Sequence, residues 1–322
     1  MEVVKEHKLL GTLVSSNGER ITEMKKRIKQ SNSVANEVVL ICKETELSNL
    51  RLRYVKLLSS ACLDSKVKFG CSLWNISKSA QTVDDLNRIK PKLLKRVMEM
   101  PLSTPSSAIQ YEFGLNDLSI EVLMEKIILA VETCKRDSER VAKKLLEPLL
   151  EKNVPGFCTE VKEACGILGV DFNEVLTKND SRVFMKQKLL EIQGKQLFKI
   201  MAVSSKMDKV LMNDFKYDGK MMKYLKELDF RDARAVFMTR YRMLPTKSNF
   251  PGRWEGQHCN ICGFLDLDEH IFTCPGYKDL VTDELSLEMF WNIDVLNDME
   301  ILSVAAKTMK LIIERMEGIQ GM

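Results

Sequence analysis

Apolar residues recur at helical spacing along most of the chain. In the first third they predict one helix from Glu19 onward, a second over Leu50–Leu63, and a third from Thr82 toward Pro101. Ser48 and Thr82 precede the second and third of these patterns and can cap them, because a hydroxyl oxygen accepts a hydrogen bond from a free N–H of the first turn. The first third is therefore predicted to be helical.

The rest of the chain also shows helical periodicity, and the one segment with a different pattern lies near the N-terminus. Leu9–Val14 has the pattern of a short strand, and the Asn17-Gly18 pair after it is typical of a tight turn. Residues 117–230 are predicted to be helical almost throughout, with stops near Asn153–Gly156 and Asp214–Gly219. A final amphipathic helix is expected over about Met299–Met316. The fold class is thus mainly α.

Composition supports a globular helical protein. Of 322 residues, 45% are hydrophobic and 29% charged, while Gly (15) and Pro (8) are scarce enough to permit long helices. Charges at the start of the chain, where a signal peptide would need an apolar segment, and the absence of an apolar run of about 18 residues argue against secretion and a membrane span. We expect a soluble intracellular protein, in the nucleus or the cytoplasm.

Four residues near the C-terminal end have the spacing of a metal site. Six of the nine cysteines are scattered, as is usual for reduced thiols, but Cys259-x2-Cys262-x7-His270-x3-Cys274 brings three cysteines and a histidine together. A tight turn lets the first pair share one ion, with Gly263 easing the turn, and one helical turn would direct the second pair to it. Zinc takes such a set tetrahedrally with no open position, so a structural zinc ion is expected.

The neighbours of these four residues are assigned to other roles. His258 lies next to Cys259 and is expected to point away from the ion. Asp266, Asp268 and Glu269 fall between the ligand pairs and are expected in a solvated loop, with hydrogen bonds to the ligands as the alternative. The site is predicted to organise residues 253–277.

Net charge is unevenly distributed. Residues 1–100 contain 19 Lys/Arg and 11 Asp/Glu, whereas the rest of the chain is acidic overall, for a total of +4. A basic first third is compatible with a polyanionic partner, and equally with an ordinary solvated helical surface.

Two sets of short motifs follow one another in a fixed order. The C-terminal set is Arg242-Met243-Leu244-Pro245, Gly252-Arg253-Trp254, the Cys259-x2-Cys262 pair and Glu269-His270-Ile271-Phe272-x-Cys274-Pro275-x-Tyr277. The N-terminal set is Leu9–Gly18, Lys26-Arg27-Ile28, Lys68–Trp74, and Met100–Pro105 with Ala108, Glu112, Gly114 and Leu115. Together they resemble the reverse transcriptases of non-LTR (LINE-like) retrotransposons: the C-terminal set resembles the cysteine-histidine tail of that family, and the N-terminal set the end of its palm and its thumb. Residues 117–230 carry little of this likeness.

The resemblance implies a division of the chain and its partners. Residues 1–116 would form a thumb-like region, 117–247 a helical connector, and 248–322 the zinc module with the terminal helix. In the family the thumb grips a template–primer duplex, and the tail helps to bind RNA or DNA. The residues that would contact phosphates here are Lys25, Lys26, Arg27, Lys29, Arg51, Arg53, Lys56, Arg240, Arg242, Lys247 and Arg253. Trp254 and Phe264 would either stack on bases or pack a small zinc core.

The polymerase chemistry of that family is not expected in this chain. It needs palm carboxylates that hold two divalent ions, including an aromatic-x-Asp-Asp turn that would precede residue 1. Asp84-Asp85 is the sole Asp-Asp pair and is interpreted as a charge pair at a helix start. Because the sequence also lacks a phosphate-binding loop and a nucleophile elbow, we predict a catalytically silent protein.

Three alternatives stay open at this level. The first is a helical protein-interaction scaffold that the zinc site stabilises. The long, acidic loop of seven residues between Cys262 and His270 suits a phosphate backbone poorly and is compatible with this alternative. In that scaffold the apolar face of the terminal helix would dock a protein partner through Ile301, Val304, Ala305, Met309, Ile312 and Ile313. The reading frame could also be a decaying remnant, or a truncated gene model of a full reverse transcriptase, which the genomic sequence upstream of Met1 would decide.

Overall fold

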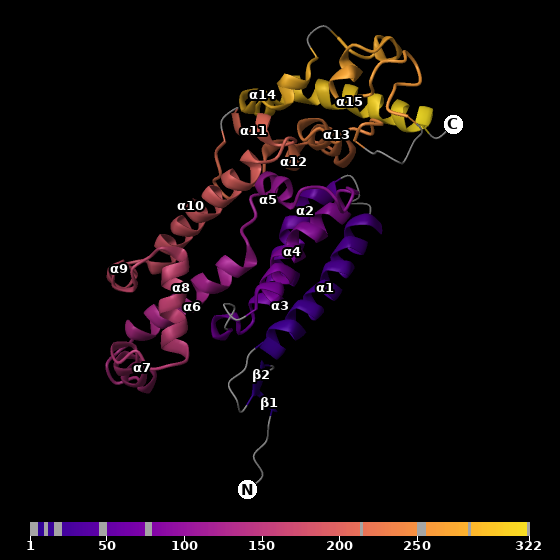
Figure 1. The fold of residues 1–322 in the computed structure, drawn as a ribbon. Coiled ribbons are helices and arrows are strands. Elements are labelled where there is room, and N and C mark those ends of the chain that lie inside the picture. Colours follow the sequence, from indigo (N-terminus) through magenta and orange to yellow (C-terminus); the bar gives the residue numbers. More distant parts are fainter. Residues whose placement is uncertain are drawn as a thin grey trace.

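The computed structural model describes residues 6–9, 12–15, 21–44, 50–74, 79–212, 215–249, 256–282 and 285–320. The chain is mainly helical, as predicted, and its helices form three groups along an elongated body (Figure 1). In that view the N-terminal group lies at the lower right and the C-terminal group at the top. Most of residues 118–202 lie at the lower left, whereas residues 208–227 lie next to the C-terminal group. Of the described helices, none is both long and apolar enough to cross a bilayer.

A small hairpin precedes the first helix. Strand β1 (Glu6–Leu9) pairs antiparallel with β2 (Thr12–Ser15), and Leu9 lies opposite Thr12. The prediction of one strand across Leu9–Val14 is therefore wrong, because the chain reverses inside that segment. The predicted Asn17-Gly18 turn lies outside the described residues.

Four helices form the N-terminal group. They are α1 (Ile21–Glu44), α2 (Arg51–Leu58), α3 (Ser65–Lys68) and α4 (Ala80–Val97). α1 and α4 lie side by side, and Met24 and Val38 are buried in the same core as Leu86 and Leu93. The two long helices thus build the core of this group.

Two helix ends in this group differ from the prediction. A π-helical turn over Ser59–Asp64 joins α2 to α3, so the helix runs past the expected end at Leu63. α4 is capped by Ser79, whose Oγ accepts from the backbone N of Thr82 at 3.4 Å. Ser79 has the extended backbone that an N-cap needs, whereas Thr82 is already helical. The predicted cap Ser48 lies outside the described residues.

The middle group extends from α5 to α12. Its members are α5 (Ser106–Phe113), α6 (Leu118–Cys134), α7 (Val141–Glu151), α8 (Phe157–Leu168), α9 (Phe172–Thr177), α10 (Ser181–Ala202), α11 (Asp208–Met212) and α12 (Lys223–Glu227). Both predicted interruptions are confirmed, since Lys152–Gly156 separates α7 from α8 and residues 215–222 are not helical. α6 packs against both α8 and α10, and most of its residues are buried.

The C-terminal group consists of α13 (Phe230–Arg240), α14 (Ile293–Asn297), α15 (Met299–Gln320) and the loops between them. α15 begins at Met299 as predicted and runs four residues beyond the expected end. Its side chains Ala305, Met309, Ile312 and Ile313 are buried, and α15 packs along α13. Most of the apolar face expected to dock a partner is therefore internal, while Ile301 and Val304 are exposed.

A buried ion pair joins this group to the rest of the molecule. Arg240 of α13 is 1% exposed and Glu112 of α5 is fully buried, with Arg240 Nε 2.7 Å from Glu112 Oε1. The hydroxyl of Tyr241 donates to the same oxygen at 2.6 Å, and Arg240 Nη1 donates to the carbonyl oxygen of Phe290 at 2.6 Å. Burial alone would lower the pKa of Arg240, but the Glu112 carboxylate raises it above its ordinary value. The pair and its hydrogen bonds hold three distant segments together.

Candidate metal centre

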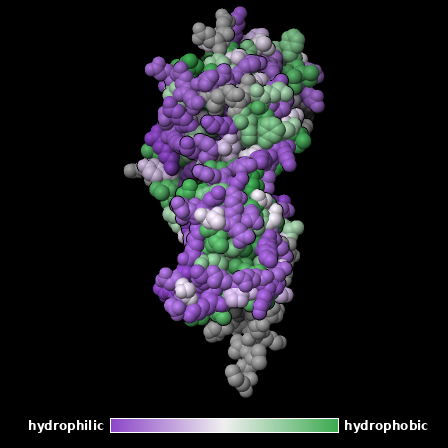
Figure 2. All heavy atoms as spheres, turned by 90° about the vertical axis from the view of Figure 1, so that its left-hand side faces the viewer, coloured by the Kyte–Doolittle hydropathy of each residue, from purple (hydrophilic) through white to green (hydrophobic). Residues whose placement is uncertain are grey.

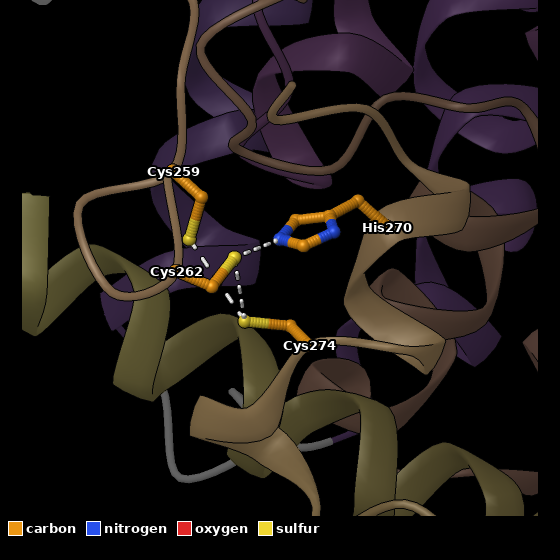
Figure 3. A group of neighbouring side chains, drawn as sticks. All are labelled: Cys259, Cys262, His270 and Cys274. Atoms are coloured by element: carbon orange, nitrogen blue, oxygen red, sulfur yellow. Dashed lines mark hydrogen bonds between the residues drawn. The ribbon is translucent and has the colours of Figure 1, made fainter. Parts of the chain in front are cut away.

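Four ligand-type side chains meet at one point of the C-terminal group. The Sγ atom of Cys274 lies 3.9 Å from that of Cys259 and 3.8 Å from that of Cys262. Cys262 Sγ lies 3.0 Å from Nε2 of His270, and all four ligand atoms fall within 4.8 Å of one another (Figure 3). The four residues predicted from their spacing are thus brought together, and they could hold a metal ion.

The first two cysteines lie on a tight turn. The backbone N of Gly263 donates to the carbonyl oxygen of Cys259 at 3.0 Å, and the N of Cys259 donates to the carbonyl oxygen of Phe264 at 2.7 Å. The N of Ile261 points at the Cys259 sulfur, at 3.4 Å. Gly263 has φ 78°, a left-handed conformation that glycine adopts without a steric penalty, so the predicted role of this glycine is confirmed.

The other two ligands are placed differently from the prediction. His270 lies in a 3-10 turn over Glu269–Phe272, and Cys274 comes just before a second 3-10 turn, Pro275–Tyr277. The expected α-helical turn between them is wrong. Pro275 has no N–H to donate and disfavours a helical conformation at Cys274, so the chain bends there instead.

Two aspartates fasten the metal loop to the helical body. Asp266 and Asp268 are 5% and 6% exposed, which overturns the expectation of a solvated loop for them. Asp266 accepts from the backbone N of Lys247 at 2.8 Å, and Asp268 accepts from the side chain of Asn249 at 2.8 Å. Burial raises the pKa of Asp268 to about 6. Glu269 is exposed and pairs with Arg242 at 3.8 Å.

The terminal helix braces the other side of the centre. Arg315 of α15 donates to both carboxylate oxygens of Asp279, at 2.6 and 2.8 Å, and to the carbonyl oxygen of Gly276 at 3.0 Å. Tyr277 is buried beside the cluster. The segment that carries the ligands is thus held on one side by the residues that follow α13 and on the other by α15.

The predicted nucleic-acid contacts that the structure describes are exposed, half-buried or buried. Lys25 and Lys29 of α1 and Arg53 of α2 are exposed, although Arg53 also donates to the carbonyl oxygen of Glu227 at 2.9 Å. Lys26, Lys56 and Arg242 are half-buried: Lys26 lies 3.8 Å from Glu23, and Lys56 donates to the carbonyl oxygen of Phe113 at 3.2 Å. Arg253 and Trp254 lie outside the described residues.

Four of the predicted phosphate contacts are instead buried, which argues against that role for them. They are Arg27, Arg51, Arg240 and Lys247. The side-chain nitrogen of each lies close to a side-chain oxygen: Arg27 is 2.6 Å from Glu23, Arg51 is 3.1 Å from Glu99, Lys247 is 2.7 Å from Asn260, and Arg240 pairs with Glu112 as described above. Arg51 also lies over the ring of Phe230. Arg27 and Arg240 would have to leave a buried carboxylate to reach a phosphate, which is costly. The partners of Arg51 and Lys247 are exposed, but these two basic side chains are themselves buried.

A surface feature of the loop does not follow from the motif analysis. Ile261, Phe264, Leu265 and Leu267 are 42%, 70%, 49% and 44% exposed, and all lie on the turn and loop between the ligand pairs. Of these four, the sequence pattern draws attention to Phe264 alone. The sequence does contain a signal for this exposed surface, because four large apolar residues occur in a segment too short to bury them in a core of its own.

Comparison with protein families, with curated proteins and with solved structures finds no match to this chain. The centre is therefore interpreted from its geometry. The chain is mainly α, and its C-terminal group carries a cluster of Cys259, Cys262, His270 and Cys274 that could bind a metal ion.

Proposed function

We propose that the cluster holds one zinc ion in a structural role. Zn–S bonds of about 2.3 Å in a tetrahedron place two sulfur atoms about 3.8 Å apart, close to the two S–S distances observed here. Three sulfurs and an imidazole nitrogen are donors that zinc favours. Four protein ligands leave no open position for a substrate, so the ion stabilises the fold and performs no chemistry.

We further propose that the chain is a catalytically silent, retroelement-derived protein that binds RNA or DNA without sequence preference. The observation that carries this proposal is the exposure of Lys25 and Lys29 one helical turn apart on α1. Neither lysine has an ion-pair partner among the described residues. Side chains with this spacing suit successive contacts with a nucleic-acid backbone, and the ordered motifs of the reverse-transcriptase family support the same assignment.

Charge reversal on α1 tests this function. For Lys25→Glu/Lys29→Glu we expect weaker binding to a duplex and a smaller slope of log affinity against log salt, by roughly one unit for each phosphate that the variant no longer neutralises. The measurement is a fluorescence-anisotropy titration of labelled RNA and DNA duplexes at several salt concentrations. Metal content should be unchanged, because the centre lies in another helical group.

Lys195→Glu/Lys199→Glu on α10 is the matched control. It makes the same charge change at the same spacing between two exposed lysines, on a helix of the middle group. Equal salt slopes for both double variants, or no binding by the wild-type protein at low salt, would refute the nucleic-acid function.

A protein-interaction scaffold is the second candidate, favoured by the apolar residues exposed on the metal loop. Phe264→Ser distinguishes the two, since base stacking contributes affinity with little dependence on salt. If Phe264 stacks on bases, the variant should bind nucleic acid several-fold more weakly with an unchanged salt slope. Unchanged nucleic-acid affinity would instead assign this apolar surface to a protein partner.

A further inference from the structure

A cavity of about 300 Å³ lies between α13 and α15, two helices of the C-terminal group. Its lining comes from residues of both helices and from Glu99, in the turn after α4. Phe230, Ala235 and Ile313 are buried and form its apolar part, whereas the other lining residues are charged. An apolar wall with a few polar groups, at this volume, is typical of a small-molecule site.

One charged residue of the cavity has no partner in the described chain. The Nε atom of Arg234 is buried and makes no hydrogen bond. Of the other basic lining residues, Arg231 lies 3.8 Å from Glu314. Lys310 lies 3.5 Å from Asp232. Arg234 forms no such ion pair with a described residue. A buried donor without an acceptor costs free energy, and a ligand that supplies the acceptor removes that cost.

The charges beside Arg234 do not neutralise it. Glu99 lines the same cavity, but its Oε1 already lies 3.1 Å from Arg51 and 3.6 Å from Lys43. Burial lowers the pKa of Arg51, Glu99 opposes this effect, and the positive charge of Arg234 adds to it. Arg234 therefore lies close enough to a second guanidinium to be repelled by it. An anion bound at Arg234 would relieve that repulsion.

The backbone of Glu99 is a further sign of a site. Its φ is 55°, a left-handed conformation that is uncommon for residues other than glycine. Glu99 is the residue after the C-cap of α4, a position at which glycine is usual. Strained residues of this kind cluster at ligand sites, where the side chain has a task that offsets the strain. Here the side chain holds Arg51 and Lys43 beside the cavity.

The remaining charges of the cavity limit what it can bind. Glu314 and Glu317 of α15 also line it, and Glu317 has no ion pair with a described residue. These carboxylates would repel a dianion such as a phosphate monoester. A carboxylate carries a single negative charge, which matches the one unpaired guanidinium, and the two groups form parallel hydrogen bonds.

A second, larger cavity lacks these features. It has a volume of about 660 Å³ and lies among α7, α8 and α9. Figure 2 views the molecule from the side of these helices, where apolar side chains gather between hydrophilic bands. The acidic residues in its lining are Glu147, Glu151 and Asp171, and Lys162 is the basic one. This cavity therefore does not favour an anion.

We propose that the cavity between α13 and α15 binds a small monocarboxylic acid with an apolar body, and that Arg234 holds its carboxylate. Phe230, Ala235 and Ile313 contact the apolar part of the ligand. Glu314 and Glu317 disfavour more highly charged ligands. This inference depends neither on the metal nor on nucleic acid.

An NMR titration of the ¹⁵N-labelled full chain with sodium benzoate tests the proposal. Benzoate should shift the amide signals of residues 230–235 and 310–317 in a saturable manner. Benzamide, which has the same shape without the charge, should bind at least tenfold more weakly. Phenyl phosphate should also bind more weakly than benzoate, because the carboxylates of α15 repel its second charge. No saturable shift with benzoate at tens of millimolar, or equal affinity for benzamide, would overturn the proposal.

Replacement of the arginine separates a ligand contact from a structural role. Arg234→Met should weaken benzoate binding by at least tenfold, yet leave the free energy of unfolding unchanged or higher, because no partner of Arg234 is lost. Arg136→Met makes the same change at an exposed arginine of the middle group and should leave benzoate binding unchanged. An Arg234→Met variant that binds benzoate normally, or that is less stable than the wild type, would contradict the inference.

The same variant decides between a carboxylate and a phosphate. Arg234→Met should leave the affinity for an RNA or DNA duplex and its salt dependence unchanged. Tighter binding of phenyl phosphate than of benzoate, or a smaller salt slope for duplex binding in Arg234→Met, would assign the cavity to a phosphate group and overturn the carboxylate assignment.

Discussion

Replacing His270 with alanine is expected to release the metal ion and to unfold residues 256–282. Structural zinc contributes on the order of 10 kcal/mol to the folding of such segments. Ile261, Phe264, Leu265 and Leu267 are exposed, so the ligand turns have no apolar core of their own, although Asp266, Asp268 and Arg315 tie the surrounding segments to the rest of the molecule. Elemental analysis gives the metal content, and hydrogen exchange of the backbone amides in 256–282 reports the local unfolding. Cys259→Ser should have the same effect.

His258→Ala is the matched control for this prediction. His258 is exposed next to Cys259, and its backbone bridges to Leu265, so its side chain lies outside the cluster. The control should retain about one zinc per chain and normal exchange rates. A reduced, folded wild-type protein without metal, or a His270→Ala variant that keeps it, would contradict the structural zinc site.

The second large effect is expected at Arg240. Arg240→Met should lower the free energy of unfolding by about 3–5 kcal/mol, because it leaves the Glu112 carboxylate buried without its positive partner. It also removes the hydrogen bond to the carbonyl oxygen of Phe290, which links α13 to the segment before α14. Chemical denaturation followed by circular dichroism measures the change.

Two further variants show whether the buried charge is the cause. Arg231→Met on the same helix removes an exposed pair with Glu314, 3.8 Å long, and should cost less than about 1 kcal/mol. Glu112→Gln/Arg240→Met neutralises both partners while keeping an acceptor for Tyr241, and should recover much of the stability lost in Arg240→Met. A destabilisation by Arg240→Met no larger than that by Arg231→Met would refute the role assigned to this pair.

Local patterns in the sequence were sufficient for the helices and for the metal ligands. Periodicity and turn residues predict the start of α15 at Met299 and the break between α7 and α8, because each of these signals involves only residues a few positions apart. The Cys259–Cys262 pair is equally local, since two residues between cysteines require a tight turn. Where the local signal was ambiguous, as in the hairpin of β1 and β2, the prediction failed.

The environments of the charged side chains could not be obtained in this way. The sequence shows Arg27, Arg51, Arg240 and Lys247 as basic residues at suitable spacing, and only packing reveals that each is buried with a partner. Glu112 lies 128 positions before Arg240, so no periodicity connects them. The burial of Asp266 beside Lys247 depends likewise on how two loops meet.

The sequence by itself determined the mainly α fold class and the four residues of the metal cluster, because both depend on interactions between neighbours along the chain. The tertiary structure decided which charges are available to a partner, which face of α15 is internal, and that apolar side chains of the metal loop are exposed. Those properties depend on contacts between segments far apart in sequence. The free energy of a charge or an apolar side chain is set by the surroundings that such contacts create.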